Sequence, residues 1–158
     1  MFVTEQIGSD KMYRDPIGHR IKTLNNLLKR NMDKNFGHHP DHATLMHTWI
    51  IGFLQDREDL GMDTFQKDIE AEFSINRSTT SEMLKLMCKK GMIQRVAVTY
   101  DARLKKIVLT DQSREFNAMI SQRMEKLHNI LVDGLTDDEI EAYIKISDKL
   151  IANIKKDL

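Results

Sequence analysis

Apolar residues recur at helical spacing, three or four positions apart, along most of this 158-residue chain. Such a stripe lets a helix bury one face and expose the other. The pattern predicts six helices, over about residues 16–36, 40–60, 63–73, 77–90, 111–132 and 136–154. Between the fourth and the fifth, β-branched and apolar residues over 92–99 and 105–110 predict two short strands. We therefore expect a mainly α-helical chain with one small β-hairpin.

Capping residues mark where these helices begin and end. Asp15-Pro16 favours a helix start, and Gly37 is expected to end that first helix before the second starts near Pro40. The sequence over 63–66 resembles a capping box for the third helix, and that over 136–139 does so for the last. The residues expected to face inward in the second and third helices are Leu45, Met46, Trp49, Ile50, Phe53, Leu54, Phe65, Ile69 and Phe73.

The fourth helix has two distinct faces when its residues are placed at 100° intervals. Asn76, at the end of a turn over 74–76, can cap this helix. The half expected to pack carries Met83, Leu84, Leu86 and Met87. The opposite arc carries Ser78, Ser81, Glu82, Lys85 and Lys89, with Arg77 at its edge. The second of two short helices thus presents a polar, net basic face, and the hairpin that follows has a charged tip over 99–106. A helix-turn-helix followed by a basic hairpin is a winged helix, a shape suited to duplex DNA.

Charge is sorted along the chain although its total is zero, with 24 basic and 24 acidic residues. The segment 77–106 holds eight basic and two acidic residues and so has a net charge of +6, whereas 56–72 and 133–141 are acidic. A polyanion is therefore a plausible partner for the basic segment. The single cysteine, Cys88, fits a reducing cytoplasm, and neither a signal peptide nor a membrane-spanning apolar run is expected.

The most specific sequence pattern lies in the hairpin and its flanks. Lys89-Lys90-Gly91-Met92-Ile93-Gln94-Arg95 is followed by Asp101-Ala102-Arg103 and then by Ile107-Val108-Leu109-Thr110. This pattern, with the order of the helices, resembles the MarR family of winged-helix transcriptional regulators over almost the whole chain. Ser113 departs from the family, which usually has Gly shortly after that Thr, and Cys88 stands where many members carry Glu.

The resemblance implies a single MarR-like domain over 1–158, with a winged-helix lobe over about 37–110. The helices over about 1–36 and 111–158 would form the dimerisation part of a homodimer. Each winged helix would then sit on one half of a palindromic site, so that protein and operator share a two-fold axis. Family members commonly repress transcription, and many release DNA when a small ligand or an oxidant acts on them.

The predicted DNA contacts follow from these elements. Arg103 can reach the minor groove or flanking phosphates, and by analogy with the family Asp101 orients its guanidinium group. Candidate major-groove residues are Arg77, Ser78, Ser81 and Lys85, whereas Lys89, Lys105 and Lys106 are predicted to contact phosphates regardless of sequence. The alternative for each of them is an ordinary solvated surface.

Three other features leave alternatives open. His19, Met46, Trp49 and Phe53 could line a small-molecule cleft where the dimerisation helices meet the winged helix, or they could be ordinary core residues. His38, His39, His42 and His47 crowd one segment, but their spacing matches no strong zinc pattern, so we predict no metal site. Cys88 is either a semi-buried small hydrophobe or a redox switch whose pKa Lys89 and Lys90 lower.

The sequence favours a dimeric, sequence-specific DNA-binding regulator, with no cofactor beyond an unidentified small-molecule effector. A winged helix retained as a protein-interaction adaptor is the alternative. An enzyme is a distant third, because the chain contains no Gly-rich phosphate loop, no Gly-x-Ser-x-Gly motif and no metal-hydrolase motif.

Overall fold

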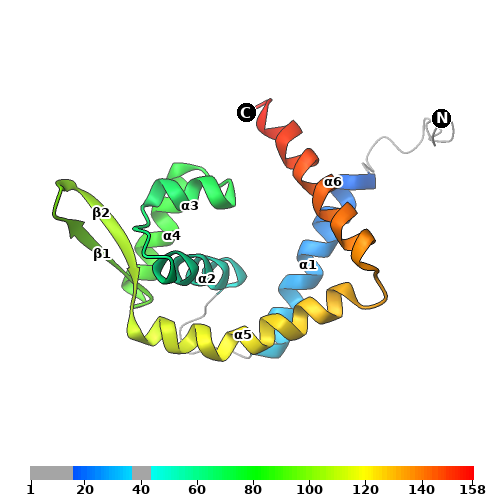
Figure 1. Ribbon diagram of the computed structural model, residues 1–158, viewed down its shortest axis with the longest axis horizontal. Coiled ribbons are helices and arrows are strands. Elements are labelled where there is room, and N and C mark those ends of the chain that lie inside the picture. The colour runs from blue at the N-terminus through cyan, green and yellow to red at the C-terminus, as the bar shows by residue number, and fades with distance from the viewer. Residues whose placement is uncertain (1–15, 37–43) are drawn as a thin grey trace. The chain divides into compact units, whose positions relative to one another are not determined.

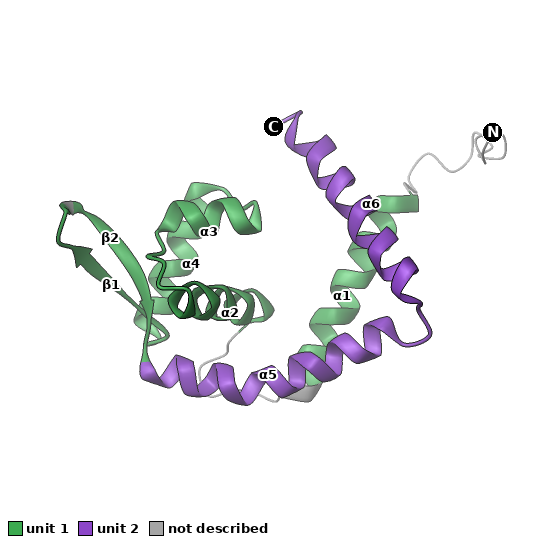
Figure 2. Ribbon diagram, in the orientation of Figure 1, with its two compact units in different colours: residues 1–110 green, residues 111–158 purple. Residues whose placement is uncertain are grey.

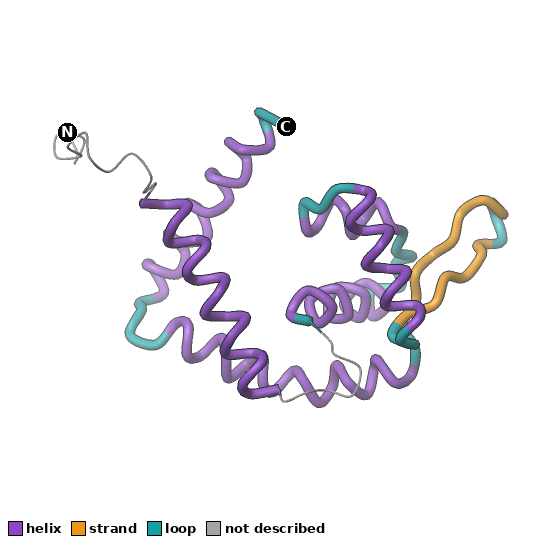
Figure 3. Tube along the Cα trace, turned by 180° about the vertical axis from the view of Figure 1, so that it is seen from behind, coloured by secondary structure: helices purple, strands orange, loops and turns teal. Residues whose placement is uncertain are grey.

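The computed structural model describes residues 16–36 and 44–158. Its elements, in order, are α1 (Pro16–Phe36), α2 (Leu45–Asp59), α3 (Gln66–Phe73), α4 (Arg77–Lys89), β1 (Ile93–Val98), β2 (Asp101–Leu109), α5 (Asp111–Val132) and α6 (Asp137–Lys155) (Figure 1). The expected mainly helical chain with one hairpin is thus confirmed, and Figure 3 shows the hairpin against the helices. The chain divides into two compact units, 1–110 and 111–158 (Figure 2). No helix in the described ranges is long and apolar enough to span a bilayer.

The winged-helix part of the first unit is built by α2, α3, α4 and the hairpin. Helix α3 packs on α4, α4 packs on β1, and α2 packs on β2. Its fully buried side chains are Ile50, Ile51, Leu54, Ile69, Thr80, Leu84, Met87 and Ile93. These come from four of the five elements, so a single apolar core fixes the two helices of the helix-turn-helix against the base of the hairpin.

The buried face of α4 differs in part from the expected one. Leu84 and Met87 are buried as expected, but Leu86 is 42% exposed. Thr80 lies in the core instead, and with Leu84 and Met87 it forms a buried stripe at positions i, i+4 and i+7, which spans about two helical turns. Its burial is tolerated because its hydroxyl donates a hydrogen bond to the Asn76 carbonyl at 3.0 Å. The expectation for Leu86 was wrong, since the packed arc is narrower than half the helix.

Helix α2 begins at Leu45, so the expected start near Pro40 was wrong. Thr44 is its N-cap, and His47 completes a capping box. The His47 backbone N–H donates to Thr44 Oγ1 at 3.3 Å, and the Thr44 backbone N–H donates to His47 Nδ1 at 3.2 Å. The two bonds satisfy donors that a helix start otherwise leaves free. Asp15, Gly37 and Pro40 lie outside the described residues.

The capping role of His47 predicts a pH-dependent stability. Burial, and secondarily the charge of Lys90, lower the pKa of His47 below its ordinary value of 6.5. The neutral ring is required because a protonated Nδ1 cannot accept the Thr44 N–H. A pKa lowered in the folded state means that this stability is present above the unfolded pKa and is lost as pH falls through the folded pKa.

We expect urea denaturation to show a loss of about 1 kcal/mol in the free energy of unfolding as the pH falls below 6.5 and through the lowered pKa of His47, where this cap breaks. His47→Gln is the matched control, since its side-chain oxygen can accept the same bond without titrating. The variant should lose less stability than the natural protein over the same pH range. Equal losses would show that His47 protonation does not contribute.

Helix α3 begins at Gln66, two residues later than a cap at Asp63 would give, so that expected cap was wrong. The Phe65 backbone N–H donates to Asp68 Oδ2 at 2.8 Å, and Phe65 takes the N-cap position. Asp63 and Thr64 are held by β2 instead. The Thr64 carbonyl accepts from the Ile107 N–H at 2.7 Å, so this short segment pairs with the outer edge of the hairpin. Of the three residues expected to face inward in α3, only Ile69 is fully buried.

The turn between α3 and α4 agrees with the sequence. Ser74 adopts a left-handed conformation with φ of 51°, and Asn76 Oδ1 accepts from the Thr79 N–H at 2.8 Å. This cap fixes where α4 starts, and Gly91, with φ of 69°, ends it. The residues on the exposed face of α4 are therefore set by local sequence.

The hairpin is tighter than expected. Strands β1 and β2 are antiparallel and joined by the two-residue turn Thr99-Tyr100, so the expected eight-residue tip over 99–106 was wrong. Ala97 pairs with Lys105 while the next residue, Val98, pairs with Asp101. Residues 102–104 therefore bulge from β2, which bends the strand and carries Arg103 outward. We call this hairpin, residues 93–109, the wing.

The second unit consists of α5 and α6. The bounds of α5 agree with the prediction, and Thr136 and Glu139 form the expected capping box of α6. The apolar stripe of each helix was expected to be buried, but the two helices differ in how far this holds. Ile120 and Leu127 of α5 are buried, but no residue of α6 is. Its exposed apolar residues, 50–65% accessible, are Tyr143, Ile144, Ile146, Ile151 and Ile154, so a single chain leaves this face of α6 uncovered.

Candidate nucleic-acid interface

Helix α4 presents the predicted polar face to solvent. Arg77, Ser78, Lys85 and Lys89 are exposed, and Ser81 is half-buried. Ser78 Oγ donates to Asn76 Oδ1 at 2.8 Å, and Lys85 Nζ lies 3.3 Å from Glu82 Oε1. The first contact joins Ser78 to the helix cap, while the second is a solvated pair of little energetic weight. The arc opposite the buried residues is therefore available to a partner.

The wing presents Arg103 at its bulge. The side chain of Arg103 is 94% exposed, with Nε 3.6 Å from Asp101 Oδ1. The same carboxylate oxygen accepts the Arg103 backbone N–H at 2.9 Å. Asp101 thus fixes the backbone of the bulge and lies beside the guanidinium group, as the resemblance implied. The arrangement gives the wing a cation that can enter a groove.

The two lysines that follow lie in different surroundings. Lys105 is exposed, whereas Lys106 Nζ donates to Asp63 Oδ1 at 2.8 Å. The hydrogen bond and charge of Asp63 raise the pKa of Lys106 above its ordinary value. Lys106 therefore joins β2 to the segment before α3. Its predicted phosphate contact stays a prediction, but the ion pair was not foreseen from the sequence.

The end of α2 anchors the base of the wing, which sequence reasoning missed. Arg57 donates from Nε to Thr64 Oγ1 at 2.8 Å and from Nη2 to the Asp63 carbonyl at 3.0 Å. Glu58 Oε1 accepts the Leu109 backbone N–H at 3.0 Å. The outer edge of β2 is thus held by the segment 63–64 and by a carboxylate. These residues belong to an acidic stretch whose sequence gave no sign of this contact.

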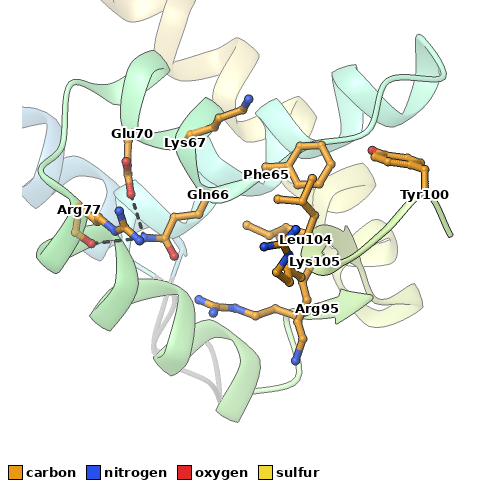
Figure 4. A pocket seen from close by; sticks show the side chains of 11 residues that line it. Phe65, Gln66, Lys67, Glu70, Arg77, Arg95, Tyr100, Leu104 and Lys105 are labelled. Atoms are coloured by element: carbon orange, nitrogen blue, oxygen red, sulfur yellow. Dashed lines mark hydrogen bonds between the residues drawn. The ribbon is translucent and has the colours of Figure 1, made fainter. Parts of the chain in front are cut away.

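A cleft of about 630 Å³ lies between α3, the start of α4 and the wing (Figure 4). We call it the basic cleft, because its lining includes the cationic side chains of Lys67, Arg77, Arg95, Arg103 and Lys105. Glu70 is the one carboxylate in this lining, and Gln66 Nε2 donates to its Oε1 at 2.8 Å. Sequence reasoning missed Arg95 and Lys67. The sequence feature that could have identified Arg95 was its place in the motif that follows Gly91. The structure places it on an exposed position of β1.

The residues predicted to bind an effector lie on two helices. His19 is on α1, where it borders a hollow of about 560 Å³ formed by α1 itself. Met46, Trp49 and Phe53 are on α2, with Trp49 37% exposed. Phe53 packs edge-on against Phe73, with ring centroids 5.8 Å apart, and Arg57 lies over its ring. Phe53 thus serves the core, and an effector role for the four residues stays a prediction.

The histidines and the cysteine also have defined places where they are described. His47 is buried in the capping box, with Nδ1 accepting a backbone N–H. No cluster of potential metal ligands occurs within 16–36 and 44–158, while His38, His39 and His42 lie outside those ranges. Cys88 is half-buried, as expected for a small hydrophobe at the border of the packed face.

Comparisons with known proteins agree with this geometry. Residues 44–104 match the model of the MarR family. The transcription regulator MarR from Oenococcus oeni is 26% identical, with a TM-score of 0.73, and the match covers 86% of this chain and 98% of that one. The haem sensor protein PefR from Streptococcus agalactiae, crystallised with haem, is 25% identical, with a TM-score of 0.59 and coverages of 89% and 94%. MepR from S. aureus, crystallised with DNA, shares the fold at 20% identity and a TM-score of 0.74, with coverages of 86% and 96%.

Proposed function

We propose that the chain is a DNA-binding transcriptional regulator, and the match of residues 44–104 to the model of the MarR family supports this proposal. The observation that carries the proposal is the joint placement of two exposed elements on one rigid winged helix. The polar face of α4 stands beside a wing whose Arg103 projects from a bulge. A helix of this kind fits the major groove, and an arginine on a hairpin suits the adjacent minor groove.

We further propose that the regulator is a homodimer acting on a palindromic operator. The uncovered apolar residues of α6 supply a surface that a second copy would bury, and Ile17, Ile21 and Leu27 of α1 are separately exposed on their own helix. Two winged helices related by a two-fold axis would then meet two half-sites. Repression, with release by a small ligand, is the regulatory mode that the family suggests for this chain.

The salt dependence of binding tests the proposal. Purified protein is titrated into a labelled duplex that it has itself selected from a random-sequence library, and affinity is followed by fluorescence anisotropy. Each phosphate neutralised by Lys or Arg contributes about −0.9 to the slope of log affinity against log salt. We expect a slope of several units. Weak binding that does not respond to salt would contradict DNA recognition and favour a protein-interaction adaptor.

A further inference from the structure

Two cationic residues of the basic cleft, Lys67 and Arg95, have no assigned role in the predicted DNA contacts, which place α4 in one groove and Arg103 in the next. We propose that this cleft receives the sugar–phosphate strand that separates those two grooves, with Arg95 as its phosphate contact. This inference rests on the proposed function and extends it to a residue and a backbone position. The DNA group that the cleft would recognise is a phosphodiester and not a base.

The topology of duplex DNA supplies the first step. The major and minor grooves of a duplex are separated at every point by one sugar–phosphate strand. A protein that places a helix in one groove and a hairpin in the adjacent groove must therefore let that strand pass between them. In this winged helix the space between α4 and the wing is the basic cleft (Figure 4), and its lining includes Arg77 of α4 and Arg103 of β2.

The lining of the cleft suits a phosphodiester. Its basic side chains come from α3, α4 and both strands, so positive charge surrounds the space rather than lying on one wall. Phe65, Leu104 and Ile107 add apolar surface that deoxyribose can contact. Gln66 ties the starts of α3 and α4 together through its bonds to Glu70 Oε1 and, at 3.4 Å, to the Arg77 carbonyl. The walls are thus held before any ligand arrives.

Arg95 is well suited to this contact. Arg103, another arginine of this lining, lies beside Asp101. By contrast, the side chain of Arg95 forms no hydrogen bond or ion pair with any residue in the described ranges, and it is exposed. It projects from β1, a strand that pairs with β2 along its whole length and packs on α4. A planar guanidinium on such a rigid support can donate two parallel bonds to one phosphate.

Arg95→Gln tests the assignment, with Arg30→Gln as a matched control, since Arg30 is an exposed arginine of α1 without a partner in the described ranges. On the self-selected duplex, Arg95→Gln should weaken binding about tenfold, the worth of one hydrogen bond to a charged group. It should also reduce the salt slope by about one unit. It should weaken binding to unrelated duplex by a similar factor, because phosphates carry no sequence information. The Arg30→Gln control should leave the affinity for the selected duplex, the salt slope and the affinity for unrelated duplex unchanged.

Neutral methylphosphonate linkages placed one at a time along the selected duplex then identify the phosphate. For the natural protein, we expect one linkage between a half-site and its flanking minor groove to weaken binding. The same replacement should cost Arg95→Gln nothing further, since the contact is already lost. If the natural protein binds with a steep salt slope but Arg95→Gln keeps its affinity and slope, this inference is overturned while the proposed function stands. If the natural protein shows no salt-dependent binding, both fail.

Discussion

An Ile151→Asp substitution in α6 is expected to convert the proposed dimer into monomers and to weaken operator binding by about 10²- to 10⁴-fold. Ile151 is 50% exposed in the single chain and lies one heptad from Ile144, which is 54% exposed, on the same helix face. A two-fold interface would contain each position twice, so one substitution buries two carboxylates without partners. The two winged helices then bind their half-sites independently, and the advantage of simultaneous binding is lost.

Sedimentation velocity measures the first effect and anisotropy on the selected duplex measures the second. Ala152→Asp is the matched control, because it introduces the same group at an exposed position of α6 that lies about 160° from the middle of this apolar face. Circular dichroism at low concentration distinguishes a folded monomer from an unfolded chain. An Ile151→Asp protein that still sediments as a dimer would show that this face of α6 is not the interface.

Replacing Arg103 with Ala is expected to cost about 1–3 kcal/mol of binding free energy, a loss of about 5- to 150-fold in affinity. The side chain is almost fully exposed and contacts only Asp101 among the described residues, so its removal should leave the fold unchanged. A groove contact made by this arginine is worth more than its solvated ion pair, because the pair contributes little in water. Stability measured by urea denaturation should match that of the natural protein.

Two companion variants sharpen this result. Arg103→Lys keeps the charge but not the planar fork, so it should recover only part of the affinity if the contact is bidentate. Lys126→Ala removes an exposed cation of α5 outside the winged helix and should leave operator binding unchanged. Unaltered affinity in Arg103→Ala would remove the wing from the interface and leave α4 as the main contact.

The elements of this protein that form from local sequence were predictable. Helix α4 begins and ends as expected because Asn76 caps it and Gly91 ends it, and both devices act within a few residues. The same holds for α6 and its box of Thr136 and Glu139. The family resemblance also rested on contiguous motifs, which is why it agrees with the match over 44–104.

The predictions that were wrong have a different cause from those that were confirmed. Asp63 was expected to cap α3, but it pairs with Lys106, 43 residues further along the chain. The wing was expected to have a long tip, yet pairing of Val98 with Asp101 leaves only two residues in the turn. Both outcomes depend on which segment of the chain pairs with each edge of a strand. The spacing of residues along the sequence does not identify that segment.

The sequence by itself therefore determined the presence of the helices, the caps of α4 and α6, the polar face of α4 and the presence of a basic hairpin, because each is set by residues within a turn or two of one another. Only the tertiary structure decided that Arg57 and Glu58 anchor the wing, that Lys106 is paired, and that Arg95 lines a cleft with Arg77. These arrangements form when distant segments pack on a common core. Their electrostatic consequences depend on distances that no local pattern encodes.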